Sequence, residues 1–499
     1  MLKDTMILLG KSDDAEVSMI PAMMNRHGLI AGASGTGKTV TLKVIAESLC
    51  EDGISTFIAD VKGDLTGMIK AGDQTAIQER LDSMGIKDFR TRSFPVRFFD
   101  VYRKNGLPMR AVMQEMDPVL LSQILGLSDT QEGVLQIIFR AAEDMQLDII
   151  DLKDLQAMTQ YVSEHASELS GKYGNVSKQS VGAIQRTLLE LEQQGGASLF
   201  GLPGLDINDL IKCEHQEGVM NILECAELYR HPMLYSTLLM WILDLLDTNL
   251  PEVGDAEKPK IVFFFDEAHI LFDNASPALM DKIKQIVKLI RSKGVGIFFC
   301  TQSPNDIPEE VLGQLSNKIQ HALRAYTPAE AKAVKTAADS FRPNPKFKTD
   351  EVITNMKTGH ALVSVLDKEG APTIAEETKI LPPMSSMSPA DSADIQQIVQ
   401  NDPLHAKYMN DIDPESAYEK MEDVKQNEDA LKAEEKQAAL EHKLAEKKAE
   451  AEQKAQIKSA EKVSKETTRI AKKLQNRAEN ELINIGIRSA KSLLKGFLK

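Results

Sequence analysis

Two patterns of apolar residues alternate between about residues 25 and 382. Short runs that are apolar at nearly every position have the length of strands buried on both faces, and longer stretches between them have apolar residues at helical spacing. This alternation predicts an α/β fold in which helices cover a mostly parallel sheet. The strand candidates are 28–31, 55–59, 219–223, 261–265, 295–300, 319–323 and 361–365.

Two segments interrupt or precede this alternation. Residues 1–24 contain two short apolar pieces around a polar turn, which predicts a small N-terminal hairpin. Residues from about 105 to 215 carry few strand signals but several stretches of helical spacing, at 117–127, 131–145 and 180–194. We interpret this segment as a helical insertion within a core of residues 25–382.

The composition changes beyond the core, in residues 383–499. Pro and Ser gather at the start of this part and predict a linker. Ala, Glu, Lys and Gln dominate from about 415 to 480 without a sustained heptad, which indicates a solvated helix or partly disordered tail, with a coiled coil or partner helix as the alternative. The last stretch, 482–499, has the pattern of a basic amphipathic helix. It could dock on protein, nucleic acid or an anionic membrane, and docking on protein is the interpretation we favour.

Composition and charge exclude several classes of protein. Hydrophobic residues make up 42% of the chain and charged residues 27%, which excludes a wholly disordered chain. The formal charge of −15 disfavours passive coating of nucleic acid by a basic surface but leaves room for a local basic channel. The four cysteines lie far apart, and the sequence contains no secretory signal and no apolar run long enough for a membrane span. We therefore expect a cytoplasmic protein without a zinc cluster, a disulfide framework or integral membrane association.

The most specific chemical signature is a phosphate loop of the form GxxxxGKS/T, which follows the 28–31 strand and precedes a helical run. Its glycines allow the backbone N–H groups to face a β-phosphate at the helix N-terminus. Lys38 is expected to reach the β and γ phosphates, and the Thr39 hydroxyl to bind Mg²⁺. ATP and Mg²⁺ are therefore the expected cofactors, and the binding residues are Gly32, Ala33, Ser34, Gly35, Thr36, Gly37, Lys38 and Thr39.

Polar residues at the ends of two later strands supply candidate catalytic groups. Asp266 follows the 261–265 strand and can hold Mg²⁺ through water. The adjacent Glu267 can polarise the water that attacks the γ-phosphate, which favours hydrolysis over nucleotide storage. Gln302 follows the 295–300 strand, where its amide can sense the γ-phosphate or the attacking water.

Other charged residues leave alternatives open. Arg291 could reach the nucleotide of an adjacent subunit as an arginine finger, or complement the dipole of a helix C-terminus. Arg324 has similar potential. Asp60 and Lys62 could line the nucleotide site or a subunit junction, or form a turn with a satisfied salt bridge.

The order of the motifs along the chain is the phosphate loop, the strand that ends in Asp266 and Glu267, Arg291 before the next strand, and Gln302 after it. This order resembles the HerA/FtsK superfamily of ring-forming translocase ATPases, and residues 25–39 and 59–67 are similar to a bacterial HerA-like helicase branch. The resemblance covers about residues 20–380. It implies a RecA-like P-loop NTPase core, usually hexameric, with ATP bound between subunits. It also implies these roles: phosphate and Mg²⁺ binding for Lys38 and Thr39, metal binding for Asp266, water activation for Glu267, sensing for Gln302, and a finger in trans for Arg291.

Two functions remain open. The resemblance favours an ATP hydrolase that forms a homo-oligomeric ring, expected to be a hexamer, and acts on DNA as a translocase or helicase-like motor. However, only about 24 residues precede the core where HerA proteins usually carry a β-barrel, and the sequence contains no winged-helix DNA reader of the FtsK type. These departures and the acidic charge favour the alternative, an ATP-dependent oligomeric scaffold or regulatory module for a protein partner.

Overall fold

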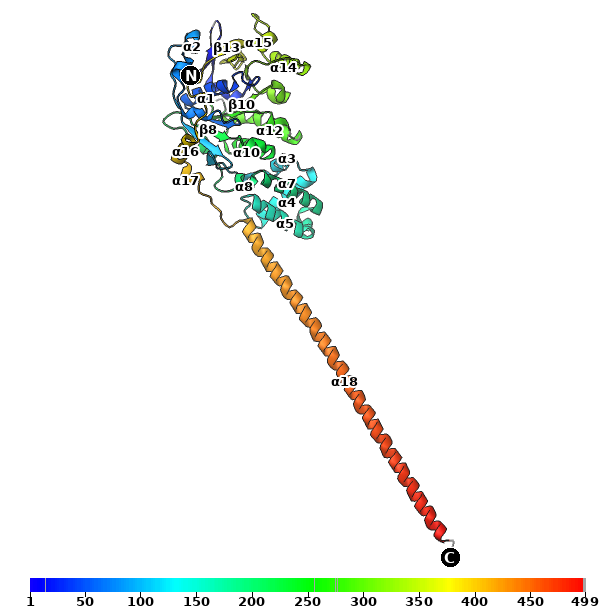
Figure 1. The fold of residues 1–499 in the computed structure, drawn as a ribbon. Helices are drawn as coiled ribbons and strands as arrows, with labels where there is room; N and C mark the ends of the chain where they lie inside the picture. The colour runs from blue at the N-terminus through cyan, green and yellow to red at the C-terminus, as the bar shows by residue number, and fades with distance from the viewer. Residues whose placement is uncertain (14, 255, 274, 276, 497–499) are drawn as a thin grey trace. The chain divides into compact units, whose positions relative to one another are not determined.

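The computed structural model describes residues 1–496 except 14, 255, 274 and 276, and side chains as far as Lys491. The chain forms two units, Met1–Met421 and Glu422–Lys499 (Figure 1). Within the described residues, thirteen strands of the first unit form one sheet. The strands are β1 (Leu2–Lys3), β2 (Met6–Lys11), β3 (Glu16–Met19), β4 (Gly28–Ala31), β5 (Ser55–Asp60), β6 (Val96–Asp100), β7 (Leu107–Pro108), β8 (Met220–Glu224), β9 (Ile261–Phe265), β10 (Val295–Thr301), β11 (Asn317–Gln320), β12 (His360–Ser364) and β13 (Glu376–Ile380).

The sheet is parallel over its larger part, and the predicted α/β class is confirmed. Its order is β1-β2-β13-β12-β11-β4-β10-β9-β5-β8-β6-β7, with β3 paired to β2. All pairs from β11 to β7 are parallel, whereas β12, β13 and the N-terminal strands pair antiparallel. All seven strand candidates overlap strands, although 319–323 shares only its first two residues with β11. Four further strands of the sheet, β1, β6, β7 and β13, were not predicted.

The predicted hairpin is present, since β2 and β3 pair antiparallel. It does not stand apart from the core, because β2 also pairs with β13 and thereby extends the main sheet. At this junction a Cβ on Gly10 would lie 2.1 Å from the carbonyl oxygen of Lys379, so the close pairing requires glycine.

The described residues of the two units also form α-helices. They are α1 (Lys38–Glu51), α2 (Gln74–Met84), α3 (Pro118–Ile124), α4 (Asp129–Asp144), α5 (Leu152–Glu164), α6 (Ala166–Tyr173), α7 (Lys178–Gln193), α8 (Gly196–Leu199), α9 (Ile207–Ile211), α10 (Pro232–Asn249), α11 (Ile270–Asp273), α12 (Pro277–Leu289), α13 (Glu309–Leu312), α14 (Pro328–Asp339), α15 (Thr349–Asn355), α16 (Ser392–Asn401), α17 (His405–Tyr408) and α18 (Ala417–Gly496).

The segment interpreted as a helical insertion folds as helices α3–α9. Its helix starts follow from the sequence: Ser128 begins α4 with a capping box, and Ser177 caps α7. Apolar residues repeat along one face of α4 and α7, and the buried ones include Ile138 and Leu188. The helices gather at one end of the first unit (Figure 1).

Residues 384–416, here called the C-terminal strap, are packed against the core instead of forming the expected linker. Met384 and Ile395 belong to the buried core of the sheet. The strap begins at Glu47 of α1, whose carboxylate accepts the backbone N–H groups of Met384 (2.7 Å) and Ser385 (3.0 Å). A buried side chain thus satisfies the strap backbone, and the local Pro and Ser content gives no indication of this contact.

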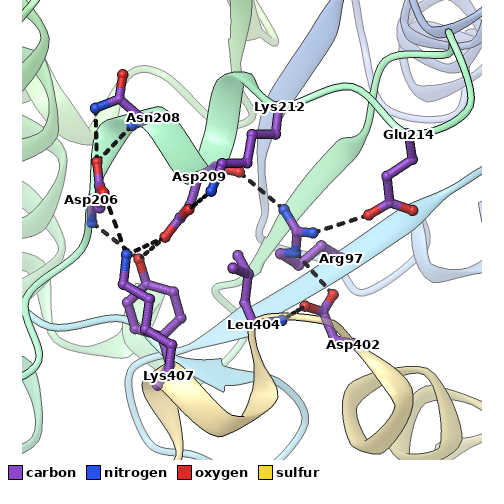
Figure 2. Close-up of polar contacts among 10 residues, drawn as sticks. Arg97, Asp206, Asn208, Asp209, Lys212, Glu214, Asp402, Leu404 and Lys407 are labelled. Atoms are coloured by element: carbon purple, nitrogen blue, oxygen red, sulfur yellow. Dashed lines mark hydrogen bonds and ion pairs between the residues drawn. The ribbon is translucent and has the colours of Figure 1, made fainter.

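A buried polar cluster holds the middle of the strap (Figure 2). Arg97 of β6 donates to Asp402 (2.9 Å) and to the carbonyl oxygen of Asp209 (3.0 Å). Asp209 in turn accepts from the Lys407 ammonium at 2.5 Å and from the Tyr408 hydroxyl at 2.7 Å. Charges removed from water in this way are stable only when paired, so the cluster ties the strap to β6 and α9.

The second unit consists of the greater part of α18, a single helix whose described side chains are all exposed from Asp429 onwards. Its helical form is compatible with both the solvated helix and the coiled coil or partner helix that the composition left open. The basic stretch 482–499 is helical as far as Gly496, and residues 497–499 lie outside the described residues. Throughout the described part of the chain, no helix combines the length and the apolar character required to cross a bilayer.

Candidate active site

The phosphate loop leaves the carboxyl end of β4 and leads into α1. Gly32, Gly35 and Gly37 all have positive φ angles, of 151°, 74° and 122°. A Cβ at Gly35 would meet nothing within 4 Å, so the loop presents an open rim. No side chain caps the N-terminus of α1 at Gly37. Free N–H groups on an open, glycine-lined loop form a cradle that fits a phosphate group.

Lys38 lies inside this loop. Its ammonium donates to the carbonyl oxygens of Gly32 (2.6 Å) and Ala33 (3.3 Å), and only 7% of the residue is exposed. Burial, together with the positive charge of Lys62, lowers the pKa of Lys38. The half-buried Thr39 follows in the first turn of α1, and Ser34 is exposed on the loop.

A buried histidine forms the floor of the loop. The ring of His321, which follows β11, would lie within 3.3 Å of a Cβ on Gly37, and its own Cβ within 2.5 Å of one on Gly32. Its Nδ1 donates to the carbonyl oxygen of His360 (2.8 Å), so its Nε2 accepts from the Thr41 hydroxyl (2.9 Å). Burial lowers the pKa of His321 to about 4, so the ring supports the loop as a neutral group.

Asp266 and Glu267 lie in a tight turn at the carboxyl end of β9. Glu267 has a φ of 49°, and the N–H of Ala268 donates to the carbonyl oxygen of Cys300 at the end of β10 (2.9 Å). Burial raises the pKa of Asp266 to about 6 against the opposing charge of Lys62. Burial is the largest single effect on Glu267 and opposes its ionisation, but the hydrogen bond and charge of Lys62, the hydrogen bond from Gln302 and the charge of His269 together lower its pKa.

Lys62 forms a salt bridge within the site itself. Its Nζ lies 2.8 Å from Glu267 Oε1 and 3.9 Å from Asp266 Oδ2. The neighbouring Asp60 organises the turn that carries Lys62, since its carboxylate accepts the N–H groups of Lys62 (3.2 Å), Gly63 (2.8 Å) and Leu65 (3.0 Å). Burial, with Asp64 next in effect, raises the pKa of Asp60 to about 7.

Gln302 lies at the tip of β10, where its Nε2 donates to Glu267 Oε2 at 3.4 Å. His269 Nδ1 is also 3.4 Å from that oxygen. The structure therefore places Gln302 beside Glu267, on the strand between β9 and the phosphate-loop strand β4.

The two candidate arginines lie apart from these groups. Arg291 belongs to the 3-10 helix Ile290–Lys293, which enters β10 at the end opposite to Gln302. Within one subunit it is therefore separated from the phosphate loop by the length of the strand. Arg324 follows β11, is exposed and donates to the carbonyl oxygen of Thr354 (2.8 Å).

Comparison with known proteins agrees with this geometry. Residues 5–499 match the family described as "Helicase HerA-like C-terminal". The chain belongs to this HerA-like family. Two relatives named DNA double-strand break repair helicase HerA are similar to it. The protein of Sulfolobus acidocaldarius is 20% identical over 361 residues, covering 71% of this chain and 65% of the relative. That of Saccharolobus solfataricus is 23% identical over 366 residues, covering 71% and 64%. The HerA-like chain thus spans less than two thirds of the length of these relatives.

Solved structures show the same fold. The plasmid coupling protein TrwB in complex with the GTP analogue GDPNP has a TM-score of 0.54 at 13% identity, covering 78% of this chain and 92% of TrwB. TrwB with ADP and Mg²⁺ has a TM-score of 0.51 at 14% identity, covering 74% and 88%. The HerA-like chain therefore has a RecA-like P-loop fold.

Sequence reasoning left Lys62 undecided and missed His321. Lys62 and His321 could have been identified from their positions just after strands, because parallel strands bring the polar groups at their carboxyl ends to one edge of the sheet. Their importance depends on strand order, since β5 is the neighbour of β9, and β11 is the neighbour of β4. That order is not encoded in the local pattern of this HerA-like chain.

Proposed function

We propose that this chain is an ATP hydrolase of the HerA/FtsK type that forms a ring and acts on DNA as a translocase or helicase-like motor. The observation that carries the proposal is the pair Asp266 and Glu267 at the end of β9, one strand from the phosphate loop and hydrogen-bonded through Gln302 to the strand between them. A carboxylate beside a phosphate-loop site is the group that water activation requires.

The residues of the site have distinct roles in this proposal. The loop N–H groups that follow Ala33 and the Lys38 ammonium bind the phosphates, because the N–H groups of Gly32 and Ala33 already donate to the carbonyl oxygens of Thr301 and Ala322. The Thr39 hydroxyl and the Asp266 carboxylate hold Mg²⁺. Bound Mg²⁺ supplies charge neutralisation at the β and γ phosphates. These donors fit the group, since a hydroxyl and a carboxylate are the oxygen ligands that Mg²⁺ prefers.

Glu267 is the proposed base. A glutamate carboxylate is ionised at neutral pH, so it can accept a proton from the attacking water. The Gln302 amide next to it orients that water or senses the terminal phosphate. Both residues extend from strand ends, which keeps the two groups in register.

Arg291 can take part only from a neighbouring subunit, because it lies at the opposite edge of the sheet from its own phosphate loop. We therefore propose a homo-oligomer, with a hexamer as the expected ring, in which Arg291 of one subunit faces the nucleotide of the next. The DNA substrate is proposed from the names of the HerA relatives. A cytoplasmic location is proposed from the sequence alone.

The test is ATP hydrolysis by the purified chain with and without duplex DNA, with particle mass measured on the same samples. Stimulation by DNA of a hexameric wild type supports the motor, and Lys38→Ala should abolish nucleotide binding and turnover. Hydrolysis by Lys38→Ala at the wild-type rate would refute the site.

A second function rests on a separate observation. The chain carries a charge of −15, and exposed α18 bears apolar side chains, among them Leu444, Ile457, Ile470 and Leu474. These features suit an ATP-dependent oligomeric scaffold or regulatory module for a protein partner. Hydrolysis indifferent to DNA over a range of salt concentrations favours this function over the motor.

A further inference from the structure

Lys62 closes the carboxylate pair from the solvent side. Its Nζ lies 2.8 Å from Glu267 Oε1 and 3.9 Å from Asp266 Oδ2. The exposed fraction of the side chain is 43% for Lys62, but only 12% for Asp266 and 6% for Glu267. The lysine is therefore the member of this cluster that can move at little cost, whereas the two carboxylates are fixed in the turn after β9.

The backbone on both sides of this contact is rigid. β5 and β9 pair in parallel with Ala59 opposite Phe265, so Lys62 and the two carboxylates leave the sheet at the same level. The turn that carries Lys62 is built on the three hydrogen bonds to Asp60. A change in the position of the ammonium therefore requires rotation of the lysine side chain alone, without rearrangement of the loop.

The cluster holds cations and anions together before any nucleotide binds, and Asp64 also acts on Lys62. Two cations, Lys38 and Lys62, face two anions, Asp266 and Glu267, and all four interact electrostatically. A triphosphate with its Mg²⁺ would add net negative charge, and Asp266, which would hold the metal, would no longer need a lysine as its neutralising partner. The more mobile cation is then attracted away from the carboxylates towards the phosphates.

We propose that Lys62 is the resident counter-ion of Asp266 and Glu267 and that it transfers to the terminal phosphate when a Mg²⁺-bound triphosphate enters the site. Glu267 is then released for its role with water only when that phosphate is present. This inference rests on the proposed function. It adds to it a residue that distinguishes the triphosphate from the diphosphate state.

The test compares Lys62→Met and Lys62→Arg with wild type by fluorescence titration of a non-hydrolysable ATP analogue and of ADP, both with Mg²⁺. Lys70→Met is the matched control, because Lys70 is 41% exposed and also pairs with two carboxylates, Asp394 at 2.6 Å and Asp391 at 3.3 Å. Thermal unfolding without nucleotide verifies that each variant is folded.

For Lys62→Met we expect the affinity for the triphosphate to fall by about fivefold or more, the effect of one charge at about 4 Å in water, while ADP affinity stays within about twofold. Lys62→Arg should retain most of the preference for the triphosphate, and Lys70→Met should bind both nucleotides like wild type. A folded Lys62→Met with the wild-type preference would show that Lys62 is only a structural ion pair, although the proposed function would stand. A wild type that bound neither nucleotide would overturn both.

Discussion

Replacing Asp402 by alanine removes one partner of a buried ion pair that holds the strap. The side chain of Arg97 is 4% exposed and that of Asp402 is 6% exposed, and their hydrogen bond measures 2.9 Å. Removal of one member of such a pair leaves a buried charge and costs about 3–5 kcal/mol. We expect the lower end, about 3 kcal/mol, because Arg97 keeps its contacts with Glu214 and the Asp209 carbonyl oxygen.

Urea unfolding followed by tryptophan fluorescence measures this loss. The chain has one tryptophan, Trp241, buried in α10, so its emission reports on the first unit without a contribution from α18. The control is Glu351→Ala, which breaks an exposed pair with Lys348 (75% and 64% exposed) and should cost at most about 1 kcal/mol. Equal shifts in the unfolding midpoint for Asp402→Ala and Glu351→Ala would refute the reasoning.

The remaining predictions concern the site and the backbone. Glu267→Gln should lower the rate of phosphate release about 100-fold or more while nucleotide binding persists; a nearly unchanged rate would exclude Glu267 as the base. His321→Gln removes a group whose folded pKa, about 4, lies below its ordinary value near 6.5. The stability that the neutral His321 ring contributes is fully present above pH 6.5 and is lost as the pH falls towards 4. In urea unfolding, the difference in stability between wild type and the variant should therefore shrink by about 1.4 kcal/mol per pH unit in that window. Gly133 lies inside α4, where a Cβ meets nothing within 4 Å, so Gly133→Ala should stabilise the protein by up to about 1 kcal/mol. A Cβ on Gly218 would lie 2.2 Å from a backbone oxygen, so Gly218→Ala should lower the thermal unfolding midpoint by several degrees.

The parallel part of the sheet was predictable because its strands are buried on both faces. Ile261–Phe265 is apolar throughout, and such a run has few alternatives to a central strand. β13 (Glu376–Ile380) has three charged residues, since it lies in the antiparallel part where one face need not be covered. β6 was missed for another reason: its Arg97 interrupts the apolar run and is paired only by residues of distant segments.

The candidate site was predictable where a motif and a strand end coincide. Lys38, Asp266, Glu267 and Gln302 follow β4, β9 and β10, which are neighbours in the sheet, so their approach needs only the rule for parallel strands. The partner of Lys62 needs the further fact that β5 adjoins β9. Periodicity gives the strands but not their order, and this is why the lysine remained undecided from the sequence.

The strap contacts two of the elements that lie at the nucleotide site. Glu47 belongs to α1, the helix that begins at the phosphate loop, and its carboxylate accepts the backbone N–H groups of Met384 and Ser385. Thr66, in the segment after Lys62, accepts the N–H of Ala390 (3.0 Å). Because Glu47 is buried and its pKa is raised by that burial, its charge is stable only while the strap supplies these donors. The strap therefore connects α1 with the segment that follows Lys62, and it ends where α18 begins.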